Sequence, residues 1–296
     1  MYPFEPVFRA AEVMNPMLDC DDLDIVINRN SLRKLFNFLS GSLTDSFCVG
    51  LAMVHNTLFV ERCERSAREL IRGSRQSGWG HSFEKTSTRV VKEGDRSTQH
   101  HRILRYDLGH LSCLVRFEVD ACYEEDPGDK EKMAAINTQD DLVLKLGKLS
   151  FGSTSNSDQN SSTHVHMAQR QFMPMPQSTA AEMKTSRQNV TKFLPQMWFG
   201  RTPWLIRGNH VEGTFDRVDI LNIESKFQEW EIRNQAKLRS MVTLLSQLRE
   251  AVKVNGSKRC IAIYGKGGQF EVFESTTQNN PLPDDLIRKF WGRAES

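Results

Sequence analysis

Two short pairs of charged residues stand at the ends of consecutive strand-like runs, and they constrain the fold of this chain most. The first run ends in Glu118-Val119-Asp120, and the second ends in Glu182-Met183-Lys184. Because side chains alternate along a strand, residues two positions apart share a face, with their Cβ atoms about 7 Å apart. Each pair is therefore expected to project from one side of a β-sheet at a strand end.

The run that leads to the first pair has a nearly continuous apolar face. Its members are Leu111, Cys113, Val115, Phe117, Val119, Ala121 and Tyr123. The opposite face carries Arg116, Glu118 and Asp120, so the acidic residues are grouped rather than spread along the strand. This pattern predicts a half-buried strand whose polar face carries a site, in preference to a uniformly solvated surface.

Three carboxylates and one ammonium group at two strand ends would form a site for a hard cation. Carboxylate oxygens are the ligands that Mg²⁺ and Mn²⁺ prefer in proteins. Such a site suits hydrolysis of phosphate esters and anhydrides, because the cation neutralises developing charge and activates water. An acid followed by an acid-x-lysine triplet is also the signature of the PD-(D/E)xK nuclease fold.

Other short segments occur in a fixed order around these pairs. They are 28–35 (NRNSLRKL), 57–61 (TLFVE), 78–84 (GWGHSFE), 117–120 (FEVD), 181–186 (AEMKTS), 196–200 (QMWFG) and 204–208 (WLIRG). Together they resemble the DXO family of decapping enzymes and 5′→3′ exoribonucleases, in its fungal branch, over roughly residues 25–274. The resemblance implies an α/β (α+β) fold of the DXO-like PD-(D/E)xK type, with a mixed, largely antiparallel central sheet flanked by helices.

The resemblance also implies a metal site with four ligands. Glu84, Asp120 and Glu182 are expected to contribute carboxylates, and Met183 its main-chain carbonyl. Methionine is acceptable in place of the more usual leucine, because its side chain is not used. The cofactor implied is Mg²⁺ or Mn²⁺.

Four further residues are expected to act on the substrate. Glu118, Lys184 and Gln196 are the expected catalytic residues: Glu118 would hold a water or a second cation, and the other two would position the attacked phosphate and the water. Arg29 is expected to contact the RNA 5′ end, with a surface ion pair as the ordinary alternative. Pro195 affects where Gln196 can lie on the expected helix, because proline disrupts a helix interior. Either the helix begins at Pro195, or Gln196 is displaced.

The function implied is divalent-metal-dependent hydrolysis at RNA 5′ ends. The enzyme would remove pyrophosphate or an incomplete or atypical cap, or would act as a 5′→3′ exoribonuclease. A nuclear location and a nuclear 5′→3′ exoribonuclease as partner are also implied. Two alternatives stay open: a catalytically weak homologue that binds and stabilises a nuclease partner, and a PD-(D/E)xK nuclease that acts on DNA.

Charge and composition agree with an intracellular protein that binds phosphate. The net charge of the 296 residues is only +2, but basic residues are concentrated between residues 62 and 105. Arg65, Arg68, Arg72 and Arg75 recur at helical spacing, which predicts either a phosphate track or a solvated helix face. No apolar run is long enough to span a membrane. The six cysteines lack paired spacing and are expected to be free thiols.

The domain organisation is predicted to be simple. Residues 1–20 are expected to form an irregular N-terminal arm, and residues 21–296 a single catalytic domain. A partly disordered insertion is expected at about 125–178, since 150–163 is rich in serine, asparagine and glycine. Further on, apolar residues from Leu238 to Val252 predict a core helix. Cys260–Tyr264 and Phe270–Phe273 predict a hairpin.

Overall fold

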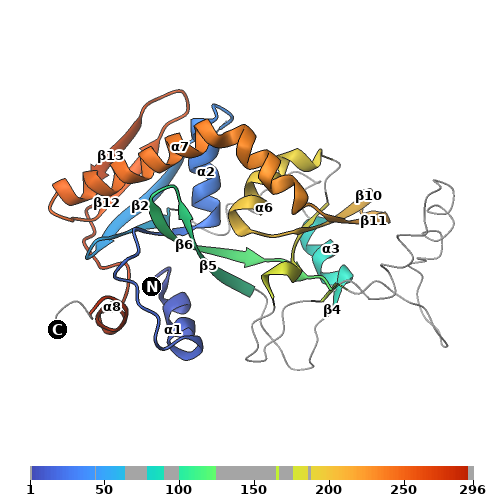
Figure 1. The fold of residues 1–296 in the computed structure, drawn as a ribbon. Helices are drawn as coiled ribbons and strands as arrows, with labels where there is room; N and C mark the ends of the chain where they lie inside the picture. The colour runs from blue at the N-terminus through green and yellow to red at the C-terminus, as the bar shows by residue number, and fades with distance from the viewer. Residues whose placement is uncertain are drawn as a thin grey trace.

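Two β-sheets, with helices on both faces of the larger one, make up the computed structural model (Figure 1). It describes residues 2–43, 45–63, 79–89, 100–124, 165–166, 176–185 and 188–292. The seven-stranded sheet has the order β13-β12-β2-β3-β1-β6-β5. Its strands are β1 (Ile25–Asn28), β2 (Phe47–Val54), β3 (Thr57–Arg62), β5 (His100–Leu108), β6 (Leu111–Val119), β12 (Cys260–Tyr264) and β13 (Phe270–Glu274).

The second sheet has six strands in the order β11-β10-β9-β7-β8-β4. Its strands are β4 (Thr88–Arg89), β7 (Ala121–Cys122), β8 (Val165–His166), β9 (Ala180–Lys184), β10 (Trp204–Val211) and β11 (Thr214–Asn222). Parallel pairs join β1 to β3 and β6, β9 to β10, and β4 to β8. The other described ladders are antiparallel. The predicted mixed, largely antiparallel α/β fold is therefore confirmed, although its strands are divided between two sheets.

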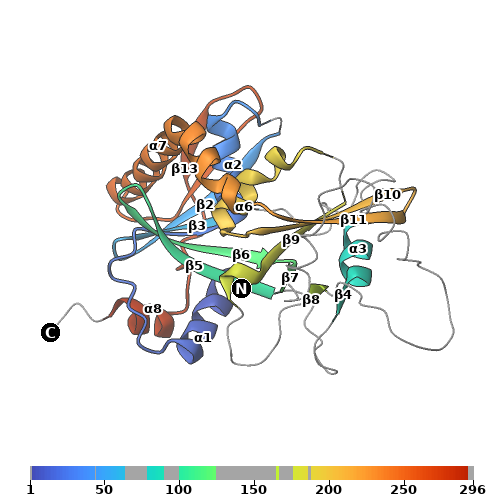
Figure 2. The same ribbon diagram turned by 45° about the vertical axis from the view of Figure 1, so that its right-hand side comes forward.

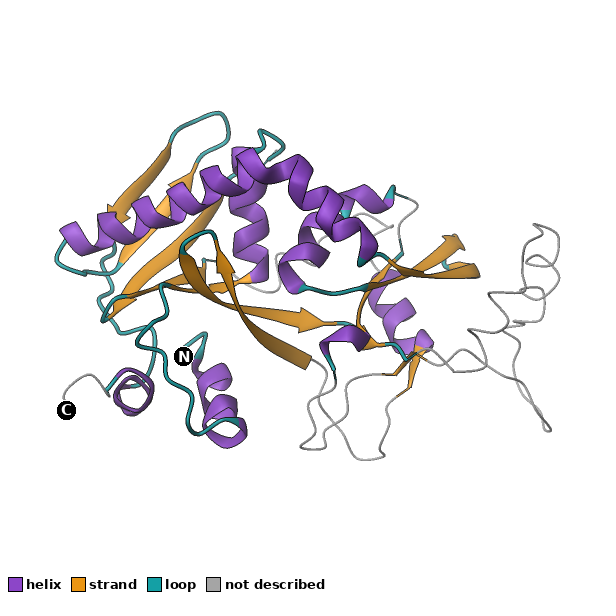
Figure 3. Ribbon diagram, viewed as in Figure 1, coloured by secondary structure: helices purple, strands orange, loops and turns teal. Residues whose placement is uncertain are grey.

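One face of the large sheet is covered by α2 (Arg29–Leu39), α6 (Leu194–Gly200) and α7 (Ser225–Val254), as Figure 3 shows. Apolar residues at helical spacing in α2 pack there, among them Leu32, Leu35 and Phe36. The helix ends before Gly41, whose φ of +64° reverses the chain at little cost for glycine. The main hydrophobic core thus lies between these helices and the sheet.

The predicted C-terminal elements are confirmed. Helix α7 buries Leu238, Met241, Leu245, Leu248 and Val252 along one face, as their spacing requires. Strands β12 and β13 form the predicted antiparallel hairpin, which pairs with the edge of β2.

The N-terminal segment corrects the expectation of an irregular arm. Residues Glu5–Met14 form helix α1, which packs with α8 (Asp284–Trp291) on the other face of the large sheet (Figure 1). Phe4 and Phe8 are fully buried there, and Phe8 lies 5.3 Å from Phe290 between ring centroids. Apolar residues four positions apart give this short segment a buried face, and docking stabilises a helix too short to form alone.

Parts of two expectations lie outside the described residues. The arginine stripe from Arg65 to Arg75 is one, and most of the insertion expected at about 125–178 is the other. The described end of that region is ordered: Gln177–Thr179 form a short 3₁₀ helix. The Trp204 indole donates to the Ser178 carbonyl at 2.8 Å. Among the helices that the structure describes, none has the length and apolar character needed to cross a bilayer.

Candidate metal and phosphate site

Strands β6, β7 and β9, which carry or adjoin Glu118, Asp120, Glu182 and Lys184, lie side by side where the two sheets join (Figure 2). Strand β6 ends at Val119, and the chain passes through Asp120 into β7 of the second sheet. Strand β7 pairs antiparallel with β9, with Ala121 opposite Ala181. This register sets Asp120 beside Glu182, because the next positions along the two strands then face each other.

Glu182 is the centre of the site. Its side chain is only 2% exposed. Lys184 Nζ donates to Glu182 Oε1 at 2.5 Å, the Gln196 amide donates to the same oxygen, and Arg29 Nη1 lies 3.0 Å from Oε2. Burial alone would raise the pKa of Glu182, but the charges of Arg29 and Lys184 outweigh it and lower the pKa to about 2. Glu182 is therefore ionised at neutral pH.

The pKa of Asp120 is shifted in the opposite direction. Its Oδ2 accepts a hydrogen bond from the main-chain N–H of Met183 at 2.8 Å, and Lys184 Nζ lies 3.9 Å away. Burial and then the negative charge of Glu182 raise the pKa of Asp120 well above its usual value. The pKa values of the two neighbouring carboxylates thus shift in opposite directions, which is typical of functional sites.

Arg29 is buried and is not a surface ion pair. It is the first residue of α2, and its guanidinium lies 5.1 Å from the centre of the Phe117 ring. Its Nη2 donates to the main-chain carbonyl of Glu118 at 3.2 Å. A Cβ at Gly200 would come 2.9 Å from Arg29 Nη1, so the glycine makes room for the guanidinium. Sequence reasoning missed this role of Gly200.

Gln196 is not displaced by the preceding proline. Helix α6 begins at Leu194, which puts Pro195 in the first turn, where its missing N–H has no consequence. The Gln196 amide is oriented by Arg33, whose Nη1 donates to Gln196 Oε1 at 2.7 Å. Sequence reasoning missed Arg33, although its position four residues after Arg29 on one helix face was a usable signal.

Glu84 and Glu118 lie at the rim of the site. Glu84 sits on α3 (Trp79–Ser87), with its Oε2 3.4 Å from His81 Nδ1. Burial raises the pKa of Glu118, and the charges of Glu84 and Glu182 raise it further. The carboxylates are therefore close enough to repel one another.

Helix α3 is held in place by its aromatic residues. The Phe83 ring is stacked on Phe215 with centroids 4.9 Å apart, and it covers Gly208. A Cβ at Gly208 would come 2.6 Å from that ring, so glycine in β10 lets α3 approach the sheet. The position of Glu84 follows from this close packing.

The chemical types of these residues suit a divalent cation, although the described side chains do not converge on one position. Among the described residues, no three carboxylates, imidazoles or thiols are arranged to hold one ion. The donor set is nevertheless rich in hard oxygen atoms, and burial together with repulsion between carboxylates raises the pKa of Glu118 and Asp120. Glu182 Oε2 is buried and pairs with Arg29 Nη1 at 3.0 Å, although it accepts no hydrogen bond within the described part of the chain. A cation beside these oxygen atoms would offset the repulsion between the carboxylates.

A cavity of about 420 Å³ beside the carboxylates carries strong positive charge. Its lining includes Arg29, Arg33, Arg62, Arg116, His101 and Glu118. Burial lowers the pKa of Arg116, and Arg62 lowers it further. Burial and the charge of Arg116 likewise lower the pKa of His101 to about 4, so the imidazole is neutral. Clustered, part-buried arginines favour a multiply charged anion, because the anion offsets their repulsion. We call this space the arginine cavity.

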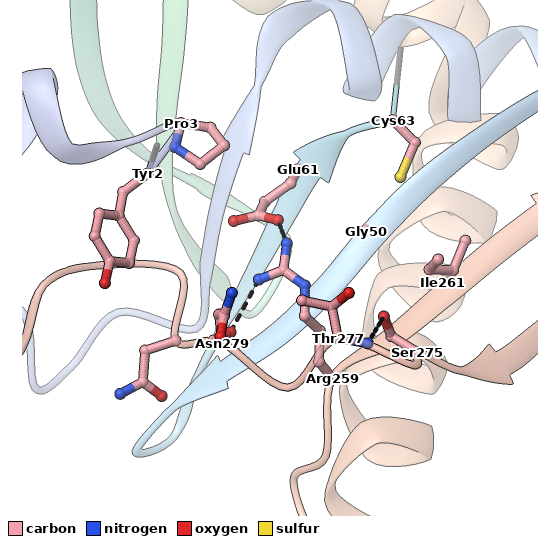
Figure 4. A pocket seen from close by; sticks show the side chains of 11 residues that line it. Tyr2, Pro3, Gly50, Glu61, Cys63, Arg259, Ile261, Ser275, Thr277 and Asn279 are labelled. Atoms are coloured by element: carbon pink, nitrogen blue, oxygen red, sulfur yellow. Dashed lines mark hydrogen bonds and ion pairs between the residues drawn. The ribbon is translucent and has the colours of Figure 1, made fainter. Parts of the chain in front are cut away.

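A separate cavity of about 410 Å³ has Tyr2, Glu61 and Arg259 in its lining (Figure 4). The Glu61 carboxylate is 3% exposed and pairs with Arg259. Arg259 Nη1 also donates to the Asn279 carbonyl at 3.1 Å. Glu61 and Phe59 share one face of β3, the face that packs against α1 and α8. This pair ties the hairpin β12–β13 to the centre of the large sheet.

Arg259→Met is expected to destabilise the protein by about 3 kcal/mol, because it leaves the buried Glu61 carboxylate without its cation. Urea-induced unfolding measures the loss. The double variant Glu61→Gln with Arg259→Met should recover part of it, since no uncompensated charge remains. A double variant that is less stable than Arg259→Met would contradict this account.

Comparisons with solved structures agree with the fold. The structure resembles Rai1 from Scheffersomyces stipitis in complex with (3′-NADP)⁺ and a calcium ion, with TM-score 0.62, 14% identity and coverage of 99% of this chain and 80% of that chain. Candida albicans Rai1 in complex with pU5 and Mn²⁺ gives 0.58, 14%, 97% and 80%. K. lactis Dxo1 in complex with manganese gives 0.51, 9%, 90% and 70%. The predicted DXO-type fold is confirmed.

Comparison by sequence identifies a family model and no curated relative. No curated protein matches the chain. The model of a family described as a domain of unknown function (DUF8563) matches residues 1–291. The chain therefore belongs to the DUF8563 family, and it has the fold of the Rai1 and Dxo1 proteins.

Proposed function

We propose that the protein is a divalent-metal-dependent hydrolase that acts on RNA 5′ ends. The observation that carries the proposal is the arginine cavity beside the group of repelling carboxylates. An acidic cation site next to a cationic anion site is what hydrolysis of a phosphate ester or anhydride requires. The resemblance to Rai1 structures solved with nucleotide ligands and metal ions supports the same reading.

The metal would be held by the carboxylates of Glu84, Asp120 and Glu182 and by the Met183 carbonyl. When bound, Mg²⁺ or Mn²⁺ would neutralise charge on the phosphate and acidify water. Glu182 needs no proton change to serve as a ligand, because it is already ionised. Asp120 would bind the metal in its ionised form, and because its pKa is raised without the metal, metal affinity should fall as the pH decreases.

The remaining residues would handle the substrate. Lys184 would turn from Glu182 toward the attacked phosphate and stabilise its developing charge. Gln196, oriented by Arg33, would position the water, and Glu118 would hold a water or a second cation. Arg29 would bind the phosphate at the RNA 5′ end. Removal of pyrophosphate, removal of an incomplete or atypical cap and 5′→3′ exoribonuclease activity are all compatible with this arrangement. A nuclear location with a nuclear exoribonuclease as partner is part of the proposal.

The test is release of product from 5′-triphosphorylated RNA with Mn²⁺ or Mg²⁺. Hydrolysis of RNA but not of matched single-stranded DNA, abolished by EDTA, is expected. Equal cleavage of DNA would replace the RNA proposal with a DNA nuclease. Failure to hydrolyse any of these substrates at saturating metal would overturn the proposal.

One observation favours a second candidate, a catalytically weak homologue that stabilises a nuclease partner. Glu182 is engaged by Lys184, Gln196 and Arg29, and the described side chains form no assembled metal centre. A cation would have to compete with these contacts. Titration of Mn²⁺ binding separates the candidates, because an enzyme must bind the metal in the concentration range that supports turnover.

A further inference from the structure

A second cationic cavity lies next to the arginine cavity. It has a volume of about 280 Å³, and its lining includes Arg33, Lys34, Lys192, Asp45 and Pro195. Arg33 lines both cavities, whereas Gln196 lines the arginine cavity and its neighbour Pro195 lines the second one. The hydrogen bond between Arg33 and Gln196 therefore stands between two adjoining spaces. We call the second space the lysine cavity.

Helix α2 connects the two cavities. Arg29, Arg33 and Asn37 follow one another at intervals of four residues, so they share one face and are spaced by about 6 Å along the helix axis. Arg29 contacts Glu182, Arg33 contacts Gln196, and Asn37 lines the lysine cavity. This face leads from the carboxylates to Lys34 and away from the reacting centre.

The charge of the lysine cavity suits a chain of phosphates. Arg33, Lys34 and Lys192 carry three positive charges, against the one negative charge of Asp45. Lys192 is exposed and Lys34 is half-buried. Flexible lysines bind phosphate as point charges and do not read base edges, so binding here would be independent of sequence.

We propose that the lysine cavity binds backbone phosphates of single-stranded RNA downstream of the reacting phosphate, through Lys34 and Lys192. The inference rests on the proposed function, in which the arginine cavity takes the 5′-terminal phosphates. A strand anchored there must leave the site, and the α2 face leads to the lysine cavity past Arg33, which lines both spaces. The substrate class is thus a 5′-phosphorylated strand of several nucleotides, and not an isolated nucleotide.

The test compares 5′-triphosphorylated RNAs of two to eight nucleotides on wild type and on Lys34→Ala with Lys192→Ala. For the octamer, KM should rise about tenfold, whereas the dinucleotide should be unaffected. The slope of log affinity against log salt should become shallower by about 1.4, which is two lost contacts to a single strand. Lys192→Ala alone, an exposed substitution, serves as the test if the double variant unfolds.

The matched control is Lys253→Ala with Lys258→Ala. Lys253 donates to Asn56, which lies just after the C-terminal end of β2. The lysine cavity lies at the other end of that strand, where Phe47 lines it. Lys258 pairs with Glu274 at 3.0 Å. These substitutions remove the same charge, so an equal loss of octamer binding in the control would reduce the effect to net charge and overturn the proposal.

Two other outcomes would also overturn it. Unchanged KM for the octamer would show that the cavity is not used. An equal loss on dinucleotide and octamer would show that it holds the 5′-terminal group instead. Direct binding of a fluorescent octamer keeps the test separate from the proposed function: if wild type binds the octamer but hydrolyses nothing, the enzymatic proposal fails. Lys34 and Lys192 can still be judged from binding in that case.

Discussion

Asp120→Asn is expected to reduce Mn²⁺-dependent hydrolysis at RNA 5′ ends by about 10³-fold or more while the protein stays folded. The substitution would remove one charged ligand from the proposed cation site, which would weaken metal binding and the acidification of water. Folding should be preserved because the asparagine side-chain oxygen can still accept the hydrogen bond from the Met183 N–H. Single-turnover hydrolysis with a Mn²⁺ titration, alongside thermal unfolding, measures both effects.

Glu182→Gln is the companion variant, and the structure indicates that it should also lower the stability of the protein. The Glu182 side chain is buried against Arg29 and Lys184. Glutamine would leave these two cations without their counter-charge, so a loss of stability should accompany the loss of activity. Asp120→Asn is therefore the cleaner test of metal binding. Near-wild-type turnover of both variants with Mn²⁺ would rule out the assigned ligands.

Local spacing predicted much of the candidate site because the relevant contacts join residues that are close in sequence. Glu182 and Lys184 share a face of β9 by strand alternation alone, and their contact follows directly. Spacing also predicted that Glu118 and Asp120 share one face of a single strand. Strand β6 ends between them, and the chain enters another sheet at Asp120. Strand periodicity cannot foresee such a change of sheet, because it depends on which distant strand offers a partner.

Other features depend on contacts between distant segments and left weak local signals. Arg33 orients Gln196 across 163 positions of sequence, and Gly200 makes room for Arg29. The arginine cavity unites residues of α2, β3, β5 and β6, and the sequence did not predict Arg33, Arg62, His101 or Arg116 as site residues. Helix α1 was missed for a similar reason. Its own apolar stripe is short, and its stability comes from α8 at the other end of the chain.

Lys184→Ala is expected to slow the chemical step by about 10²-fold while leaving divalent-cation binding intact or slightly stronger. Lys184 Nζ contacts Glu182 Oε1 at 2.5 Å and lies 3.9 Å from Asp120, so its charge competes with a cation for both carboxylates. Glu182 and Asp120 in turn outweigh burial and raise the pKa of Lys184, which keeps the ammonium charged. Removing this charge should favour metal binding, whereas the attacked phosphate would lose a stabilising contact.

A Mn²⁺ titration, run in parallel with single-turnover hydrolysis at saturating metal, separates these two effects. Lys184→Arg is the matched control: it retains the positive charge near Glu182 and should leave metal affinity close to that of wild type, whereas its larger planar head should restore the chemical step only in part. Loss of metal affinity in Lys184→Ala, with unchanged chemistry at saturating Mn²⁺, would show that the lysine only supports Glu182. In that case the arginine cavity alone would have to stabilise the charge that develops on the phosphate.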